Sequence, residues 1–287
     1  MSQFLEYLLT GLGIGSGFAL VGSGLVAIYR VTRVVNFAQG AFAVLAAMLV
    51  STLLASGLPH GLAEPVAVIA AGGIGVLVGM VAIGKPGTSP RASLIVTLGL
   101  GIFAYAVEVL AWGDQPRSFP GLAGATEFAG ARVQTHYLLV IGVTVPVFAL
   151  MALFFARTDL GKALSACASN RYAARVVGID VTKMGLLAFG IGGALGGLAG
   201  VLITPVQQVT FDTDVTLIVN GFAAAVLGGL LRPAVTLAGG LLLGVAQTLV
   251  AGYGLGAYQL ELALGLMLAV MIVQTARTTP LAEGVPE

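Results

Sequence analysis

Long apolar runs, separated by short polar segments, dominate the pattern of this chain. Nine of the runs approach the length of about 20 residues that a helix needs to cross a bilayer. They lie at 5–28, 36–56, 64–84, 92–111, 137–156, 184–206, 216–231, 234–251 and 258–276. The run at 216–231 is short, which is typical of a half-helix or a re-entrant segment. The pattern predicts an all-α polytopic membrane protein with eight or nine transmembrane segments, in a single domain over 1–287.

Composition agrees with a membrane protein. Of the 287 residues, 58% are hydrophobic and only 9% are charged, whereas soluble domains carry roughly 25% charged residues. The opening MSQFLEYLL lacks basic residues and contains Glu6, so we expect the first run to stay in the membrane and not to be cleaved as a signal peptide. The single cysteine, Cys167, excludes an intramolecular disulfide framework. We expect lipid around this chain and no nucleic acid partner.

The basic residues between the runs predict an orientation. Lysine and arginine follow the first, third, fifth, seventh and last runs, at Arg30, Arg33, Lys85, Arg91, Arg157, Lys162, Arg171, Arg175, Lys183, Arg232 and Arg277. The loops on the opposite side hold Asp114, Glu127, Asp212 and Asp214, and their cations are Arg117 and Arg132. Because cytoplasmic loops are rich in Lys and Arg, we expect the N-terminus outside and the C-terminus in the cytoplasm.

Ionisable residues are rare inside the runs. Glu108 and Glu261 lie near the expected outer ends, where we expect their burial to cost least, and no Lys, Arg or Asp lies mid-run. Proton-coupled pumps and voltage sensors place such groups at membrane depth. The chain is therefore not expected to carry its own ion coupling: energy comes from elsewhere, or the chain is a passive pore.

The longest polar segment is RTDLGKALSACASNRYAARVVGIDVTK, residues 157–183. Asp159 can cap a first short helix, and Ser169 or Asn170 can cap a second, which Gly178 suits as an end. Two such helices would form a compact projection, a knob, to which a partner protein could bind. The alternative is an ordinary solvated basic loop.

Three stretches, in this order, resemble the permeases of bacterial ABC importers of the branched-chain amino acid type. The first is VTRVVNFAQGAF, and the second is RTDLGKALSACASNRYAARVVGI followed by AFGIGGALGGLAGVL. The third is AVLGGLLRPAVTLAGGLLLGVAQTLVAGY. The resemblance covers almost the whole chain, and its length is similar to that of the shorter of the family's two permease subunits.

This resemblance implies a type II importer fold in the bacterial inner membrane. Its partners would be a second permease, usually a distinct homologue, two cytoplasmic ATPases and a periplasmic substrate-binding protein. ATP and Mg²⁺ would bind to the ATPases, so we expect no cofactor and no enzyme activity on this chain. The segment 157–183 would sit in the ATPase cleft. The matching coupling positions are Thr158, Leu160, Gly161, Ala163, Ala166, Ala174, Gly178 and Ile179.

The chain departs from this family in two places. Family members often carry Arg-Ala where this chain has Ser165-Ala166, which concerns the contact with the ATPase. They also often carry His-Gly-Glu where this chain has Gln39-Gly40-Ala41. This difference bears on whether the chain carries the family's usual amino acid solute.

Glycines recur at helical spacing in IGGALGGLAGV. Gly192, Gly196 and Gly200 are each four residues apart, as are Gly193 and Gly197. Such rows let a neighbouring backbone approach closely, so we interpret them as helix-packing faces and not as ligand sites.

Two patterns that resemble nucleotide-binding motifs do not indicate a nucleotide site, and two histidines do not indicate a metal site. GMVAIGKP has Pro86 where a P-loop needs Ser or Thr, and GLGIFA lies inside an apolar run without a βαβ unit. His60 and His136 belong to no metal motif.

The stretch around the amides at the start of the second run is loosely repeated later in the chain. IVNGFAAAVLGG loosely repeats VVNFAQGAFAVLAA and aligns Asn220 with Asn36, while the preceding runs point in opposite directions. This pattern indicates an inverted-topology repeat, in which both asparagines lie where helices break. Our hypothesis is that the amides border a solute path with aromatic walls, at Asn36, Phe37, Gln39, Asn220 and Phe222. The alternative is that the amides only cap or cross-link helices.

The leading interpretation is the permease subunit of an ATP-driven importer that works by alternating access. A path without fixed charge suits a branched-chain amino acid or a similar small polar solute; urea, amides or small organic acids are the alternatives within the family. An ATP-independent channel or secondary carrier is the second class, and a membrane enzyme is a distant third.

Overall fold

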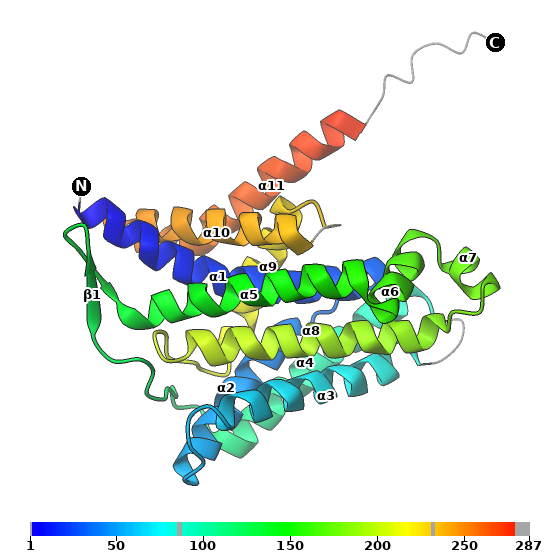
Figure 1. Cartoon of the computed structure of the whole chain (residues 1–287), viewed down its shortest axis with the longest axis horizontal. Coiled ribbons are helices and arrows are strands. Elements are labelled where there is room, and N and C mark those ends of the chain that lie inside the picture. The colour runs from blue at the N-terminus through cyan, green and yellow to red at the C-terminus, as the bar shows by residue number, and fades with distance from the viewer. Residues whose placement is uncertain (1, 85–87, 231–232, 279–287) are drawn as a thin grey trace.

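A computed structural model describes residues 2–84, 88–230 and 233–278 of the chain, and these are mostly helical. Figure 1 shows α1, α5 and α8 running lengthwise, with α6 and α7 at one end and the β1–β2 hairpin at the other. In order, the elements are α1 (Ser2–Thr32), α2 (Gln39–Ala55), α3 (Ala63–Ile83), α4 (Pro90–Trp112), β1 (Ala125–Phe128), β2 (Ala131–Gln134), α5 (Thr135–Arg157), α6 (Asp159–Ser169), α7 (Arg171–Val176), α8 (Val181–Ile203), α9 (Thr213–Leu227), α10 (Pro233–Val250), a π-turn (Ala251–Leu255), a 3₁₀ turn (Gly256–Tyr258) and α11 (Gln259–Thr278).

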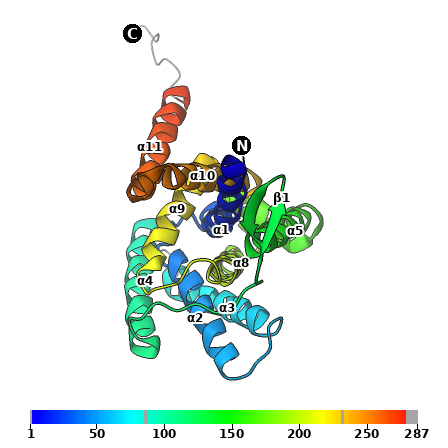
Figure 2. The ribbon, with the colours of Figure 1, turned by 90° about the vertical axis from the view of Figure 1, so that its left-hand side faces the viewer.

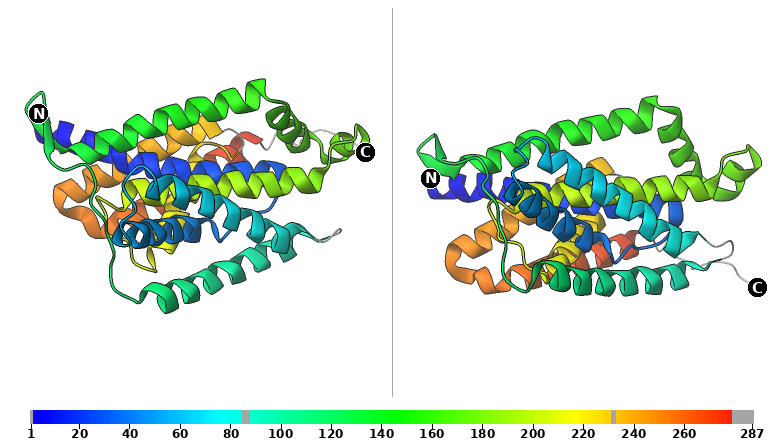
Figure 3. Two further views of the ribbon diagram at one scale, coloured as in Figure 1. Left: turned by 60° about the horizontal axis from the view of Figure 1, so that its bottom comes forward. Right: turned by 90° about the horizontal axis from the view of Figure 1, so that it is seen from below.

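Helix α1 forms the centre of the bundle, where it contacts α5, α8, α9 and α10. In its most apolar 18-residue window 89% of the residues are buried, against 11% for α4 and 17% for α5. The α1–α10 pair is close because glycines meet there: a Cβ on Gly15 would lie 2.5 Å from the Gly240 carbonyl oxygen. In Figure 3, α4 and α5 lie on opposite sides of the bundle.

Every predicted run contains a helix, and the all-α membrane fold is confirmed. Among the described residues, six apolar stretches are long enough to cross a membrane, and one of them, Val235–Thr275, contains both α10 and α11. Helix α9 has 15 residues, or about 22 Å at 1.5 Å per residue, which is less than the hydrocarbon core of about 30 Å. This length agrees with the half-helix expected at 216–231.

The second run, 36–56, is shorter than predicted. Its helix, α2, begins at Gln39 and has 17 residues. The chain leaves the helical conformation at Arg33, whose φ is 60°, and the Asn36 Oδ1 accepts a hydrogen bond from the backbone N–H of Ala38. This local turn occupies the residues that were expected to open a full span.

A small hairpin departs from the all-α prediction. Strands β1 and β2 pair antiparallel in the loop between α4 and α5. The turn takes positive φ at Ala129 and Gly130, 49° and 80°. Along β2, buried Ala131 and Val133 alternate with exposed residues. Each strand has only four residues, which is too short for an alternating pattern to be recognised in the sequence.

The helical stretch after α10 contains a sharp break. Tyr253 and Gly254 have non-helical backbone angles, and Gly254 has a φ of 86°, which glycine adopts easily. Helix α11 therefore leaves α10 at an angle. The end-on view in Figure 2 shows α9 between α10 and α4, with α11 extending from the bundle.

Candidate functional site

The knob, defined as residues 158–179, consists of the two capped helices α6 and α7. Thr158 caps α6, since its Oγ1 accepts from the Gly161 N–H at 3.0 Å; the prediction that Asp159 is the cap was wrong by one residue. Asn170 caps α7, with its Oδ1 accepting from the N–H groups of Tyr172 and Ala173. Gly178, with a φ of 86°, ends the segment as expected.

The knob is fixed to the end of α1 by two arginines. Arg33 donates from Nη2 to the Ala168 carbonyl oxygen at 3.0 Å. Arg171 donates from Nη1 to the Thr32 carbonyl oxygen at 3.1 Å. The two bonds run in opposite directions across the same junction, so α6, α7 and the end of α1 are held as one unit.

Several of the predicted coupling residues face the inside of the knob. Gly161 packs on α5, where a Cβ would lie 2.2 Å from the Phe154 carbonyl oxygen. Ala174 belongs to a buried cluster that includes Leu164 and Cys167. Burial raises the pKa of the Cys167 thiol, and the nearby Arg171 opposes this only in part. Ala163, Ala166 and Ile179 are half-buried, whereas Thr158, Leu160 and Gly178 are exposed.

The outer surface of the knob carries large apolar side chains that the sequence analysis did not single out. Tyr172 is 78% exposed, Val176 is 69% exposed and Val177 is 75% exposed. Three large apolar residues within the most basic segment were a usable signal, because a merely solvated loop has no need of them.

The first pair of predicted path amides, Asn36 and Gln39, is fully buried, each 0% exposed. Gln39 donates from Nε2 to the Gly192 carbonyl oxygen of α8 at 2.8 Å, and Asn36 Nδ2 lies 3.4 Å from Gln39 Oε1. A Cβ on Gly24 of α1 would lie 2.3 Å from the Gln39 Nε2. Gln39 thus fills a notch between α1 and α8. A path role for these two amides stays a prediction.

The second predicted location, Asn220, lies elsewhere. Its Oδ1 accepts from Gln247 Nε2 at 2.7 Å, and the same Nε2 donates to the Gln259 carbonyl oxygen at 3.0 Å. These three residues line a cavity of about 250 Å³ between α1, α9, α10 and the turn before α11. Among the described residues, no hydrogen bond joins this amide group to Asn36 or Gln39.

One expectation about this region needs correction. Asn220 lies inside the continuous helix α9, whereas Asn36 lies in a non-helical turn, so the two asparagines are not at equivalent helix breaks. The break in the second half lies at 251–258 instead. Gln247 and Gln259 were missed, although two glutamines inside the apolar runs 234–251 and 258–276 were a visible signal. Phe37 is 41% exposed, and Phe222 is half-buried.

The glycine rows of α8 face different neighbours. A Cβ on Gly193 would lie 2.4 Å from the Ala71 carbonyl oxygen of α3, and one on Gly197 would lie 2.5 Å from the Ala71 Cβ. A Cβ on Gly200 would lie 2.0 Å from the Ala43 carbonyl oxygen of α2. Gly196, together with Gly24 of α1, forms the notch that receives Gln39, whereas a Cβ on Gly192 would lie 2.5 Å from the Ile28 Cδ1 of α1.

Glu108 does not lie where its burial is inexpensive. It was expected near the lipid–water boundary, but its side chain is 0% exposed. Among the described residues, neither carboxyl oxygen has a hydrogen-bond partner. Asp214 is close enough to act on it electrostatically. The buried face of α4 otherwise consists of Ser93, Thr97 and Gly101.

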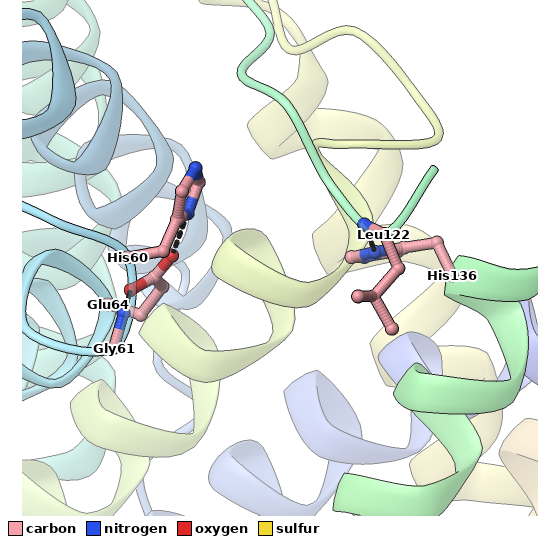
Figure 4. A network of polar contacts seen from close by, with 5 residues as sticks. All are labelled: His60, Gly61, Glu64, Leu122 and His136. Atoms are coloured by element: carbon pink, nitrogen blue, oxygen red, sulfur yellow. Dashed lines mark hydrogen bonds and ion pairs between the residues drawn. The ribbon is translucent and has the colours of Figure 1, made fainter. Parts of the chain in front are cut away.

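A larger cavity of about 550 Å³ lies beside α3, α5 and α8 and has two histidines at its rim. Figure 4 shows that the two histidines lie apart. His60 Nδ1 is 2.7 Å from the Glu64 carboxylate. His136 Nδ1 accepts from the Leu122 N–H, and its Nε2 contacts the Leu202 carbonyl oxygen at 2.9 Å. Within the described residues, no three metal-binding side chains gather here or elsewhere.

Comparison with known proteins gives a consistent result. A family model described as "Branched-chain amino acid transport system / permease component" matches residues 7–275. The chain is 27% identical to the high-affinity branched-chain amino acid transport system permease protein LivH of Salmonella typhimurium, over 94% of this chain and 93% of that protein. It is 29% identical to the corresponding permease protein BraD of Pseudomonas aeruginosa, over 94% of each chain. The solved structure of PsaBC from Streptococcus pneumoniae in complex with Fab is similar in fold, with a TM-score of 0.52, 16% identity, and 94% and 91% of the two chains covered.

Proposed function

Because this chain belongs to the family of permease components of branched-chain amino acid transport systems, we propose that it forms one half of the solute path of an ATP-driven amino acid importer. Family membership makes it a multi-pass inner-membrane permease of the ABC type. The observation that carries the proposal is the knob: a capped helix pair with an exposed apolar surface, hydrogen-bonded to the central helix.

The proposed mechanism is alternating access driven through this junction. Two cytoplasmic ATPases grip the knob and move it when they close on ATP. Arg33 and Arg171 tie the knob to the end of α1, and α1 contacts α5, α8, α9 and α10. A displacement of the knob is therefore passed to the centre of the bundle and tilts the helices around the path. ATP and Mg²⁺ belong to the ATPases, and this chain performs no chemistry.

The proposed orientation has the N-terminus outside and the C-terminus in the cytoplasm. It puts the knob in the cytoplasm together with Arg30, Arg33 and Arg91, and the hairpin outside. The knob and the hairpin lie at opposite ends of the bundle in Figure 1. Lys85 and Arg232, which also entered the charge pattern, lie outside the described residues, as does the side chain of Arg277.

The proposed solute is a branched-chain amino acid or a similar small polar molecule. A second permease, usually a distinct homologue in this family, completes the path, and a periplasmic binding protein delivers the solute. The described residues that line the 250 Å³ cavity include no charged side chain, which supports a solute without net charge.

Pull-down of the detergent-solubilised, tagged chain from its native host, with mass spectrometry, tests this function. The variant is Tyr172→Asp, which adds a charge to the exposed apolar surface of the knob; Tyr258→Asp, at a tyrosine 59% exposed, is the control. The native chain and the control should recover two ATPases and a second permease, and Tyr172→Asp should lose the ATPases. Recovery of the chain alone, with solute flux that needs no ATP, would favour a channel or a secondary carrier.

A further inference from the structure

We propose that the cavity beside Asn220 and Gln247 is a binding site for a small zwitterionic amino acid in transit through this chain. The inference rests on the proposed function and adds the place and the chemistry of recognition. The cavity is lined from sequence-distant elements: Phe18 of α1, Asn220 of α9, Gln247 of α10 and Gln259 of α11. The larger cavities beside α8, of about 550 and 420 Å³, are lined mainly by apolar residues.

The amides of this cavity keep unused hydrogen-bonding capacity. A side-chain amide offers two N–H donors and a carbonyl acceptor. The Gln247 Nε2 uses its donors on Asn220 Oδ1 and the Gln259 carbonyl oxygen. Among the described residues, nothing pairs with the Asn220 Nδ2 or the Gln247 Oε1. Both residues are almost completely buried, 3% and 4% exposed, and both line the cavity, so these two groups are available to a solute inside it.

This free donor and free acceptor match the two ends of a zwitterion. The Asn220 Nδ2 can donate to a carboxylate, and the Gln247 Oε1 can accept from an ammonium group. Because the mutual bond fixes both amides, the two groups keep a defined relative position. Among the residues that the structure describes, no charged side chain lines the cavity, so a solute with only one charge would be buried without compensation, which is costly.

The rest of the cavity suits a short hydrocarbon side chain. Ile14, Phe18, Leu217 and Leu260 supply apolar walls. The volume of about 250 Å³ is slightly below the lower limit of roughly 300 Å³ for pockets that hold drug-sized ligands. A solute smaller than a drug molecule, such as leucine or valine, is therefore the appropriate size.

The cavity also lies against the irregular segment between α10 and α11. Gly256 and Ala257 of the 3₁₀ turn line it, directly after the break at Tyr253 and Gly254. Interrupted helices commonly form solute sites in transporters, because their backbone groups are free to bond and their joints can bend. The break gives α11 a joint through which an occupied cavity can open to the other side.

Direct binding tests the inference. The assembled complex with its native partner subunits, in nanodiscs and without the periplasmic binding protein, is titrated with tritiated L-leucine. The competitors are 4-methylpentanoate, which lacks the ammonium group, and 3-methylbutylamine, which lacks the carboxylate. Leucine should compete at concentrations at least tenfold lower than either, since each lost charge-assisted hydrogen bond corresponds to about tenfold in affinity or more.

Two variants assign the site to the amides. Asn220→Asp keeps the Oδ1 acceptor and the side-chain shape but replaces the Nδ2 donor. It should weaken leucine about tenfold and make 3-methylbutylamine a better competitor than 4-methylpentanoate. Gln247→Leu should weaken leucine by a similar factor. The control is Gln274→Leu, at an exposed amide near the other end of α11 that does not line the cavity. Size-exclusion profiles establish that every variant assembles.

Several results would overturn the inference: no saturable leucine binding by the native complex, native affinity in both variants, or equal competition by the two single-charge compounds. The proposed function is measured separately, as ATP-driven uptake with the binding protein present. Native uptake in both variants would overturn the cavity site alone. Absence of ATP-driven uptake by the native complex would overturn the importer, whatever the binding experiment shows.

Discussion

At the scale of single residues, the packing of the helices depends on how closely two backbones can approach each other. Gly200 and Gly73 illustrate the difference: a Cβ on Gly200 would lie 2.0 Å from the Ala43 carbonyl oxygen, whereas one on Gly73 would meet nothing within 4 Å. Gly200→Ala should destabilise the fold by about 1–3 kcal/mol through overpacking. Gly73→Ala should cause no loss. Thermal unfolding followed by size-exclusion chromatography measures both, and equal melting temperatures would contradict the packing described for α8.

Glu108 allows a second test at this scale. Its buried carboxyl has no hydrogen-bond partner among the described residues and lies near Asp214. Glu108→Gln keeps the shape and removes the possibility of charge, so the melting temperature should be unchanged or higher. In contrast, Glu64→Gln should lower it slightly, because the Glu64 carboxylate accepts from the Gly61 N–H and contacts His60. A marked loss of stability in the Glu108 variant would show that the carboxyl has an essential partner.

At the scale of elements, two hydrogen bonds that run in opposite directions join the knob to the end of α1. Arg171→Ala removes the bond to the Thr32 carbonyl oxygen, and Arg33→Ala removes the bond to the Ala168 carbonyl oxygen. Each should lower solute uptake per ATP hydrolysed several-fold while the complex still assembles and hydrolyses ATP. Arg175→Ala is the control, because Arg175 is an exposed arginine on the same helix. A parallel fall of uptake and hydrolysis would contradict a coupling role.

The helices themselves could be predicted because apolar runs and cap residues are local signals. Gly178 was recognised as a helix end from its residue type alone, and Asn170 was one of the two cap candidates, with Ser169. The pairing of Asn220 with Gln247 could not be predicted, because it joins residues that are 27 positions apart and lie on different helices. Which face of α4 turns inward was also hidden, because most of its positions are apolar; the burial of Glu108 was missed for that reason.

At the scale of the whole molecule, the knob and the hairpin lie at opposite ends of the bundle, and the proposed orientation puts them on opposite sides of the membrane. The single cysteine, Cys167, is buried, and burial raises the pKa of its thiol. Replacing it by alanine gives a background that has no thiol for a maleimide to label. In that background, Arg132→Cys should react with a membrane-impermeant maleimide in cells with an opened outer membrane. Lys162→Cys should react only after the inner membrane is permeabilised. The reverse pattern would invert the proposed orientation.

In the proposed function, this chain moves a small solute only when ATPases drive it. The most direct measurement is the initial rate of L-leucine uptake into proteoliposomes that contain the assembled complex, with the binding protein outside and ATP on the side of the knob. We predict uptake that needs both ATP and the binding protein and that stops when ADP replaces ATP. An equal rate with ADP, or with the ATPases removed, would contradict the importer and make the chain a passive channel or carrier.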